Sequence, residues 1–381
     1  GWWCGLAFAT LPLVSALGIF VSTDAPLLFF WAAGTLALWS ALEQGRWRDW
    51  LLLGLWCGLG LMSKYTMAAF IGSAFLALLA HPRGLRQLLS PRPWAALALA
   101  VLILSPNLWW NWQHGFPTFR HTAEITRINE RHWNPAELLE FLGAQWLSFG
   151  PALSLGLLAA LATAYRRIAD PRHRTLLLLT VPLLLLVCYQ AATGRANGNW
   201  AAPIFVGGVV LAVSWAADTR RWRLLGVMVA INVLVMIGAY HWPDLARLSG
   251  KELAGRNDPY KRAKGWHAFA QAVAPYVTAN PGAILLADDR DILAQLAYDL
   301  GVKDLAAWTP DEHVMDHYQL TVPLKPGSHR TYLYVSRNAL DDRVLSRFAN
   351  ATLLGQVDVE VHRDYRRHAF IYRLEGFQGY R

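Results

Sequence analysis

The chain has 381 residues, of which 55% are hydrophobic and only 16% are charged, whereas soluble globular chains carry about 25% charged residues. This composition excludes an ordinary soluble enzyme, a disordered protein and a nucleic-acid-binding domain, and the 19 tryptophans are typical of membrane–water interfaces. The formal net charge is +9, and most of the excess lies in residues 1–242, where positive loops orient membrane helices.

Residues 1–242 are predicted to form a polytopic α-helical membrane domain with about nine helical segments. A helix needs about 20 apolar residues to cross a bilayer, and the predicted segments are 2–20, 25–42, 94–111, 141–165, 175–191, 200–217 and 223–241. The apolar stretch 50–80 is too long for one span. Its interruption at Ser63-Lys64-Tyr65 predicts two shorter helices that meet at the break.

Arginines gather in four short loops between these segments, at residues 46–48, 83–92, 166–174 and 220–223. Such loops face the cytoplasm. Strict alternation then places residues 21–24, 63–65, 112–140, 192–199 and the tail on the opposite face. Within 112–140, Asn134 is predicted to begin a helix, and the segment is either an amphipathic interfacial helix or a solvated loop.

Residues 243–381 are predicted to form a small extracytoplasmic α/β domain. The expected order is a helix at 261–278, a strand at 283–287, a helix at 291–300, a strand at 331–336, a helix at 339–348, and strands at 352–361 and 368–374. The length of this tail is sufficient for one core.

Two ionisable residues at predicted membrane boundaries are the first site candidates. Asp24 is the only acid among the first 42 residues, and an ionisable group at a membrane boundary is costly and usually functional. Alternatively, Thr23 or Asp24 could cap the helix that contains Pro26, and the two roles are compatible. Lys64 lies at the break between two half-length segments, where a compact cation suits a phosphate. The alternative is a lysine that snorkels to the interface.

The predicted outer loops add aromatic rings beside cations. Stacking on sugar faces and bidentate arginine–phosphate pairing would suit an anionic lipid head group that bears a sugar, although an aromatic belt with solvated charges would give the same pattern. The candidates for donor phosphate or sugar binding are Lys64, Tyr65, His114, Arg120, His121, Arg127, Arg131, Arg195, Asn199 and Trp200.

Two other patterns are weaker. Asp289-Arg290-Asp291 resembles a metal-binding Asp-x-Asp, but Asp291 is expected to cap the following helix. His313 and His317 have helical spacing but are expected to lie on a solvated face. No metal site and no cofactor are predicted, since the three cysteines all lie in apolar runs.

Several motifs in order resemble bacterial members of glycosyltransferase family 39, which includes protein O-mannosyltransferases and lipid A aminoarabinose transferases. The motifs are Ser22-Thr23-Asp24-Ala25-Pro26, Gly58-Leu59-Gly60-Leu61-Met62-Ser63-Lys64-Tyr65, Ser105-Pro106-Asn107-Leu108-Trp109-Trp110-Asn111-Trp112, Gly115-Phe116-Pro117, Gly198-Asn199-Trp200-Ala201-Ala202-Pro203, and a Gly265-Trp266 helix.

The resemblance implies a GT-C-like fold in a bacterial cytoplasmic (inner) membrane. It also implies transfer of a sugar from a polyprenyl-phosphate donor to a protein, lipid A or other envelope acceptor on the extracytoplasmic face. Asp24 would be an acidic site near the active-site cavity, and Lys64 with the outer arginines would hold the donor phosphate. The chain starts at Gly1 within an apolar run, so we expect an N-terminally truncated fragment whose principal catalytic acid lies upstream of residue 1.

Two other function classes remain open. A non-catalytic polyprenyl-lipid flippase or transporter would have a similar membrane half, with charges near mid-membrane and repeat symmetry. An external binding module on an inert anchor would have no need of so many charged and aromatic outer loops. No nucleic-acid partner is predicted, because the basic excess serves to orient the helices.

Overall fold

The computed structural model describes residues 1–127, 131–310, 314–328, 330–340 and 342–380. They form two compact units, residues 1–240 and residues 241–381.

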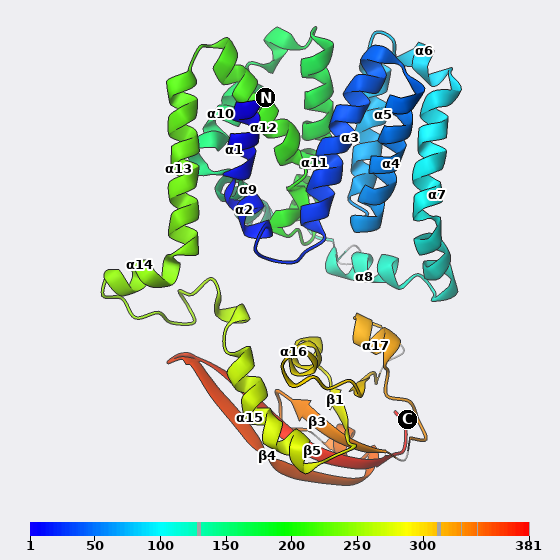
Figure 1. Ribbon diagram of the computed structural model, residues 1–381, viewed down its shortest axis with the longest axis vertical. Coiled ribbons are helices and arrows are strands. Elements are labelled where there is room, and N and C mark those ends of the chain that lie inside the picture. The colour runs from blue at the N-terminus through cyan, green and yellow to red at the C-terminus, as the bar shows by residue number, and fades with distance from the viewer. Residues whose placement is uncertain (128–130, 311–313, 329, 341, 381) are drawn as a thin grey trace. The chain divides into compact units, whose positions relative to one another are not determined.

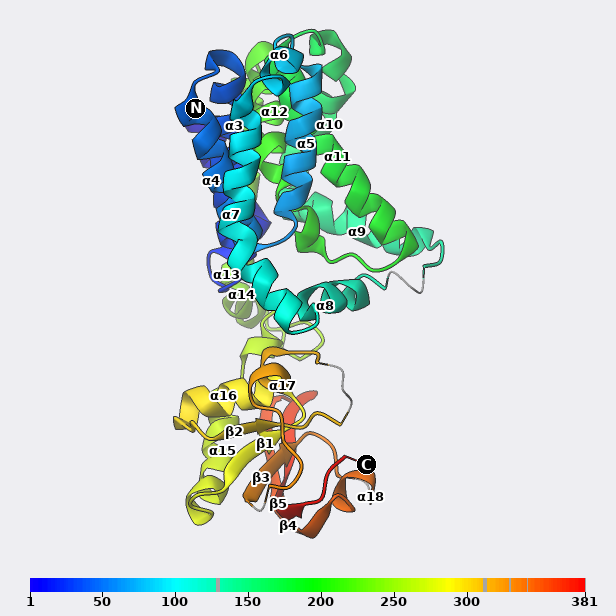
Figure 2. The same cartoon turned by 90° about the vertical axis from the view of Figure 1, so that its right-hand side faces the viewer.

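Unit 1 is helical (Figures 1 and 2). Its helices are α1 (Trp2–Ala9), α2 (Pro12–Leu17), α3 (Asp24–Gln44), α4 (Trp47–Ser63), α5 (Met67–Ala80), α6 (Gly84–Leu88), α7 (Pro91–Gln113), α8 (Pro117–Ile125), α9 (Pro135–Phe149), α10 (Pro151–Ala162), α11 (Pro171–Thr193), α12 (Ile204–Asp218) and α13 (Trp222–Tyr240), with 3₁₀ turns at Ala164–Arg167 and Gly198–Ala201.

The helices of unit 1 form two groups joined through α11. Helices α3, α4, α5 and α7 lie side by side, and α1, α10, α12 and α13 form the other group (Figure 1). Helix α11 contacts both α5 and α12. The backbones of α4 and α7 lie close together at Gly54, because a Cβ on this residue would lie 2.4 Å from the carbonyl oxygen of Ala96. A single apolar cluster, centred on buried side chains such as Trp31, Phe70 and Phe205, runs through both groups.

The described residues include four helices long and apolar enough to cross a membrane, namely α3, α7, α11 and α13. Helices α9 and α10 pass the same test as a pair but are bent by 105°. The predicted membrane-type helical character of unit 1 is therefore confirmed. The predicted break is also found, because α4 ends at Ser63 and α5 begins at Met67.

Two predicted spans are wrong as single helices. Residues 2–20 divide into α1 and α2, because Pro12 lacks an amide N–H and holds Leu11 in an extended conformation. Residues 141–165 divide at Gly150, whose φ of +93° ends α9 before Pro151 starts α10. The helices of unit 1 therefore do not correspond one to one with the predicted set of about nine segments.

Unit 2 contains a five-stranded sheet with helices. Its elements are α14 (Trp242–Leu248), a 3₁₀ turn (Lys261–Ala263), α15 (Trp266–Ala279), β1 (Ile284–Ala287), α16 (Arg290–Leu300), β2 (Leu305–Ala307), α17 (His317–Thr321), β3 (Thr331–Ser336), α18 (Asp342–Leu345), β4 (Phe348–His362) and β5 (Tyr365–Phe377). The strand order is β2-β1-β3-β5-β4. The first three strands are parallel, and β5 is antiparallel to both of its neighbours.

The sheet of unit 2 has an apolar cluster on each face, as alternating side chains require. Leu285 of β1 packs with Phe269 of α15, whereas the next residue, Leu286, packs with Trp308 and Phe348 on the other face. The predicted α/β order of the tail is largely found. The expected helix 261–278 is interrupted at Gly265, which has a φ of +79°, and the short elements α14, β2 and α17 were not predicted.

A buried ionic cluster joins two distant segments of unit 2. The Asp258 carboxylate, 3% exposed, accepts hydrogen bonds from Lys264 Nζ at 2.7 Å, His362 Nε2 at 2.8 Å and the Tyr260 amide at 2.8 Å. Burial by itself would raise the pKa of Asp258, but these hydrogen bonds and the Lys264 charge outweigh it, so the pKa lies below its usual value. The ionised carboxylate therefore contributes to the stability of this unit.

Candidate functional site

Asp24 lies at the start of α3 and is almost fully buried, with an exposed fraction of 3%. Lys64 Nζ lies 2.7 Å from its Oδ1, and Asn199 Nδ2 donates to its Oδ2 at 2.7 Å. The Asp24 side chain makes no cap hydrogen bond to the helix among the described residues, although an acid in a first turn is favoured by the helix dipole. Both carboxylate oxygens are occupied, so this residue anchors two other side chains.

Lys64 reaches Asp24 because the chain leaves helical geometry at this point. With φ −161° and ψ +134°, Lys64 is extended between α4 and α5. Its side chain remains 24% exposed, and an ammonium group has three N–H donors. One donor faces Asp24, which leaves two available to a ligand.

Asn199 comes from the 3₁₀ turn Gly198–Ala201, and this turn has a second attachment. Gln145 Nε2 of α9 donates to the Gly198 carbonyl at 2.6 Å. Trp200 is partly buried and packs against the apolar core of unit 1. The structure thus brings Asp24, Lys64 and Asn199 together, while Trp200 supports the turn from the core side.

Tyr65 belongs to a polar cluster that the sequence did not predict. Its hydroxyl donates to Asn107 Oδ1 of α7, and Asn111 Nδ2 donates back to it at 3.3 Å. Asn111, fully buried, also accepts the Thr118 amide at 3.3 Å and so ties α8 to α7. The available signal was two asparagines with i,i+4 spacing in an otherwise apolar helix.

The aromatic loop candidates lie at the end of α7 and on α8, which crosses the ends of the longer helices in Figure 1. His114 stacks on Trp110 with ring centroids 4.5 Å apart, and its Nδ1 is 2.8 Å from the Trp110 carbonyl. Arg120 is exposed beside Gly115. The His121 Nδ1 atom is buried with no hydrogen-bond partner among the described residues. In the described part of the chain, no hydrogen bond or ion pair joins these three to Asp24.

A polar pocket of about 390 Å³ lies near the 3₁₀ turn, between the end of α8, helix α9 and the end of α11. We call it the polar pocket, and its charged lining residues are Arg127, Arg195, Glu137 and Glu140. Asn197 and Gly198, which directly precede Asn199, also line it. The pocket is therefore adjacent in the chain to the residue that binds Asp24.

The charges of the polar pocket are not neutralised by pairing with one another. Within the described residues, no ion pair forms between its two arginines and its two glutamates. Among the described residues, Glu137 accepts a hydrogen bond from the Asn134 side-chain amide alone, at 3.1 Å, and Asn134 caps α9 as predicted. Arg131 lies apart, with its guanidinium 5.5 Å from the Tyr189 ring centroid. Glu137 and Glu140 were not predicted as site residues, because their spacing on α9 is ordinary for a helix surface.

The two weaker sequence patterns do not form metal sites among the described residues, where no group of three candidate ligands was found. Asp289, and not Asp291 as predicted, caps α16 by accepting the Asp291 amide at 2.7 Å. Asp289 also pairs with Arg337 at 2.7 Å. His317 is the first residue of α17, and His313 lies outside the described residues.

Comparison with known proteins gives one family match and three relatives. Residues 1–110 match the family model described as dolichyl-phosphate-mannose-protein mannosyltransferase. The chain is 32% identical over 302 residues to lipid A galacturonosyltransferase RgtD of Rhizobium johnstonii, covering 78% of this chain and 62% of that protein. It is 31% identical over 249 residues to undecaprenyl phosphate-alpha-4-amino-4-deoxy-L-arabinose arabinosyl transferase 1 of Sodalis glossinidius, and the match covers 60% of this chain and 42% of that protein.

A third relative is lipopolysaccharide core galacturonosyltransferase RgtA of Rhizobium johnstonii, 35% identical over 108 residues, covering 28% of this chain and 21% of that protein. No solved structure matches the chain. The chain spans about three fifths of the length of the first relative and less of the other two.

Proposed function

We propose that the chain acts as a membrane glycosyltransferase of the GT-C type, because residues 1–110 match the mannosyltransferase family model and the three relatives are named as sugar transferases. Its donor is a polyprenyl-phosphate-linked sugar, and its acceptor is lipid A or another envelope group. Transfer takes place on the extracytoplasmic face of a bacterial inner membrane, where the C-terminal α/β domain, residues 243–381, also lies. The arginine-rich loops support this orientation.

The observation that carries the proposal is the arrangement of Lys64. Asp24, which also accepts a hydrogen bond from Asn199, holds the Lys64 ammonium group at the break between α4 and α5, with part of the lysine side chain exposed. Sugar transfer requires a cation where negative charge develops on the departing phosphate. We assign this role to Lys64, and we assign to Asp24 the positioning of Lys64 and Asn199.

The polar pocket supports a binding site for the sugar and its phosphate. Arg127 and Arg195 offer forked donors that match phosphate or carboxylate oxygens. Glu137 and Glu140 offer acceptors for hydroxyl or ammonium groups. Because charges of both signs that do not pair with one another line the pocket, it favours a hydroxyl-rich, charged head group over an apolar ligand.

In the proposed reaction, an acceptor oxygen attacks the anomeric carbon. The new oxygen–carbon bond forms as the bond from that carbon to the donor phosphate oxygen breaks, and the electron pair stays on the phosphate. A hydroxyl acceptor loses its proton to a base, whereas a phosphate acceptor attacks as an anion. We assign no base among the residues of this chain, because both oxygens of Asp24 are already occupied.

The test is transfer of radiolabelled sugar from a polyprenyl-phosphate donor to lipid A by the full-length protein in membranes. Lys64→Ala should lower kcat by about 10²-fold or more, a loss typical of a removed charge-stabilising group, and Asp24→Asn should lower it by a smaller factor. The matched controls are Lys303→Ala and Asp304→Asn, two exposed residues of unit 2. Unchanged transfer in both Lys64→Ala and Asp24→Asn would refute the assignment, and movement of the donor across the bilayer without transfer would favour a flippase.

A further inference from the structure

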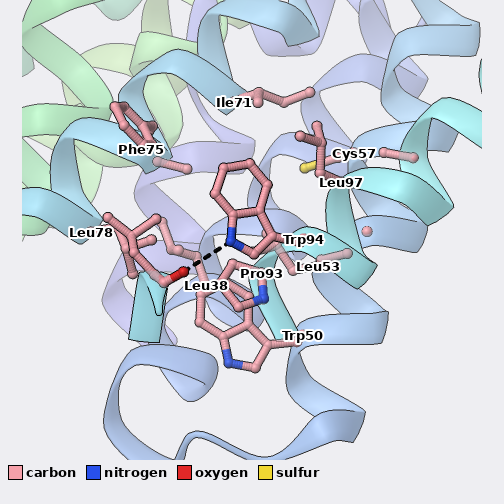
Figure 3. A pocket seen from close by; sticks show the side chains of 15 residues that line it. Leu38, Trp50, Leu53, Cys57, Ile71, Phe75, Leu78, Pro93, Trp94 and Leu97 are labelled. Atoms are coloured by element: carbon pink, nitrogen blue, oxygen red, sulfur yellow. Dashed lines mark hydrogen bonds between the residues drawn. The ribbon is translucent and has the colours of Figure 1, made fainter. Parts of the chain in front are cut away.

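An apolar pocket lies among α3, α4, α5 and α7 (Figure 3), and it shares no lining residue with the candidate site or the polar pocket. Its cavity volume is about 110 Å³, comparable with the ~150 Å³ apolar cavity that holds benzene in another protein. It is lined by side chains such as Leu38, Trp50, Cys57, Phe75 and Trp94. A space of this size and composition accommodates several methylene groups.

The apolar pocket is open at one side. Trp94 and Leu97 of α7 are 56% and 40% exposed, and Phe75 of α5 is 48% exposed. Helix α7 is long and apolar enough to cross a membrane. The surroundings that meet this opening are therefore hydrocarbon, and the natural occupant is an alkyl chain.

Three helix junctions meet beside the pocket and bring arginines together. The junction of α3 and α4 contacts the junction of α5 and α6, since Arg83 Nη1 donates to the Glu43 carbonyl at 2.8 Å. The start of α7 meets α4, since the Arg92 guanidinium lies 5.9 Å from the Trp47 ring centroid. Arg92 directly precedes two pocket residues, Pro93 and Trp94.

We call these arginines the basic rim: Arg46, Arg48, Arg83, Arg86 and Arg92. Within the described residues, none of the five forms an ion pair with a carboxylate. Three polar atoms at this end also have no hydrogen-bond partner in the described part of the chain, namely the donors Arg92 Nε and Trp50 Nε1 and the acceptor Asp49 Oδ2. Buried polar atoms are nearly always hydrogen-bonded, so the two donors need an oxygen acceptor, and the five arginines beside them favour one that carries negative charge.

We propose that the basic rim and the apolar pocket form a binding site for an anionic phospholipid. One acyl chain occupies the pocket, and the phosphate lies among the arginines. Charge complementarity selects this occupant over a zwitterionic lipid, because basic pockets between membrane helices bind anionic head groups. The site is separate from the proposed transfer site and does not depend on that function.

The test uses the full chain in detergent, delipidated and then exposed to phosphatidylglycerol that carries a photoreactive group on one acyl chain. Cross-links mapped by mass spectrometry should concentrate on the pocket residues of α4, α5 and α7. Labelling there should be at least about tenfold stronger than with phosphatidylcholine of the same chains. Labelling spread evenly over all apolar helices, or equal labelling by the two lipids, would overturn the proposal.

A second arm tests the rim with surface substitutions that leave the core intact. Each basic residue near an anionic lipid contributes about fivefold in affinity, so Arg86→Gln with Arg92→Gln should lower the preference for phosphatidylglycerol by at least about tenfold. The matched control is Arg166→Gln with Arg223→Gln, two exposed arginines of the 3₁₀ turn Ala164–Arg167 and of the start of α13. An equal loss in both double variants would show a general charge effect and would refute the site. Native mass spectrometry of the retained lipid measures this preference independently of sugar transfer.

Discussion

Removal of the Lys64 charge tests the geometry of the candidate site most directly. Lys64→Met leaves the Asp24 carboxylate, whose side chain is 5% exposed, with Asn199 as its remaining partner. Breaking a buried ion pair by removing one partner costs about 3–5 kcal/mol. Because the Asn199 hydrogen bond persists and the N-terminus of α3 favours an anion by about 0.3–1 kcal/mol, we expect a loss of about 2–3 kcal/mol in the free energy of unfolding.

The reverse substitution should cost less. Asp24→Asn leaves the Lys64 ammonium without its counter-charge, but the side chain is 24% exposed and can reach water, so we expect a loss of about 1–2 kcal/mol. The double variant should be less destabilised than the sum of the two single variants by at least about 1 kcal/mol.

Thermal unfolding of the purified chain in mild detergent measures these effects. For a unit of 240 residues, a loss of 1 kcal/mol lowers Tm by about 2–4 °C, so Lys64→Met should lower Tm by about 4–12 °C. Lys303→Met and Asp304→Asn serve as exposed controls. Single variants that match these controls, or strictly additive losses in the double variant, would refute a coupled pair at this site.

Three further predictions follow from local geometry. Gly150→Ala should destabilise unit 1 by about 2–5 kcal/mol in thermal unfolding, because the new Cβ would lie 1.9 Å from Asn232 Oδ1 at a φ of +93°. The control is Gly143→Ala, which has open space around its Cβ and should be neutral or slightly stabilising. An equal loss of stability in both variants would contradict this reasoning. Asn134→Ala should cost about 1 kcal/mol through loss of the α9 cap, seen as faster amide hydrogen exchange in the first turn of α9. Acidification should destabilise unit 2, since a carboxylate with a lowered pKa stabilises the fold above its unfolded pKa of about 3.9 and loses that contribution as the pH falls through its folded pKa. The protection of amides near Asp258 from hydrogen exchange, measured against the intrinsic exchange rate at each pH, should therefore fall below about pH 4. An equal fall in Asp258→Asn would exclude this carboxylate as the cause.

Local sequence signals predicted several elements because they depend on only a few neighbouring residues. The polar break at Ser63-Lys64-Tyr65 ends one apolar run and starts another, and the structure has the break at that point. Asn134 followed by proline has the chemistry of a helix cap, and its side chain does accept the first amides of α9. The alternation of apolar residues in the tail likewise predicted most of the sheet.

Other features escaped prediction because they depend on backbone angles or on packing between distant segments. The Gly150-Pro151 pair is a local sign of a break, but the sequence does not show the φ of the glycine, so the 105° bend was not predicted. The glutamates of the polar pocket lie on a helix that looks ordinary in sequence. Their relation to Arg127 and Arg195 arises only when α8, α9 and the end of α11 come together.

The sequence alone determined that the chain is a helical membrane-type protein with a small α/β tail, and it predicted that Asp24 and Lys64 lie at membrane boundaries. Hydropathy and loop charge are local properties, so no tertiary information was needed for either conclusion. Only the tertiary structure decided that Lys64 and Asn199 meet Asp24, across separations of 40 and 175 residues. Contacts of that kind follow from which helices pack together, and this depends on side-chain shape over the whole bundle rather than on any short motif.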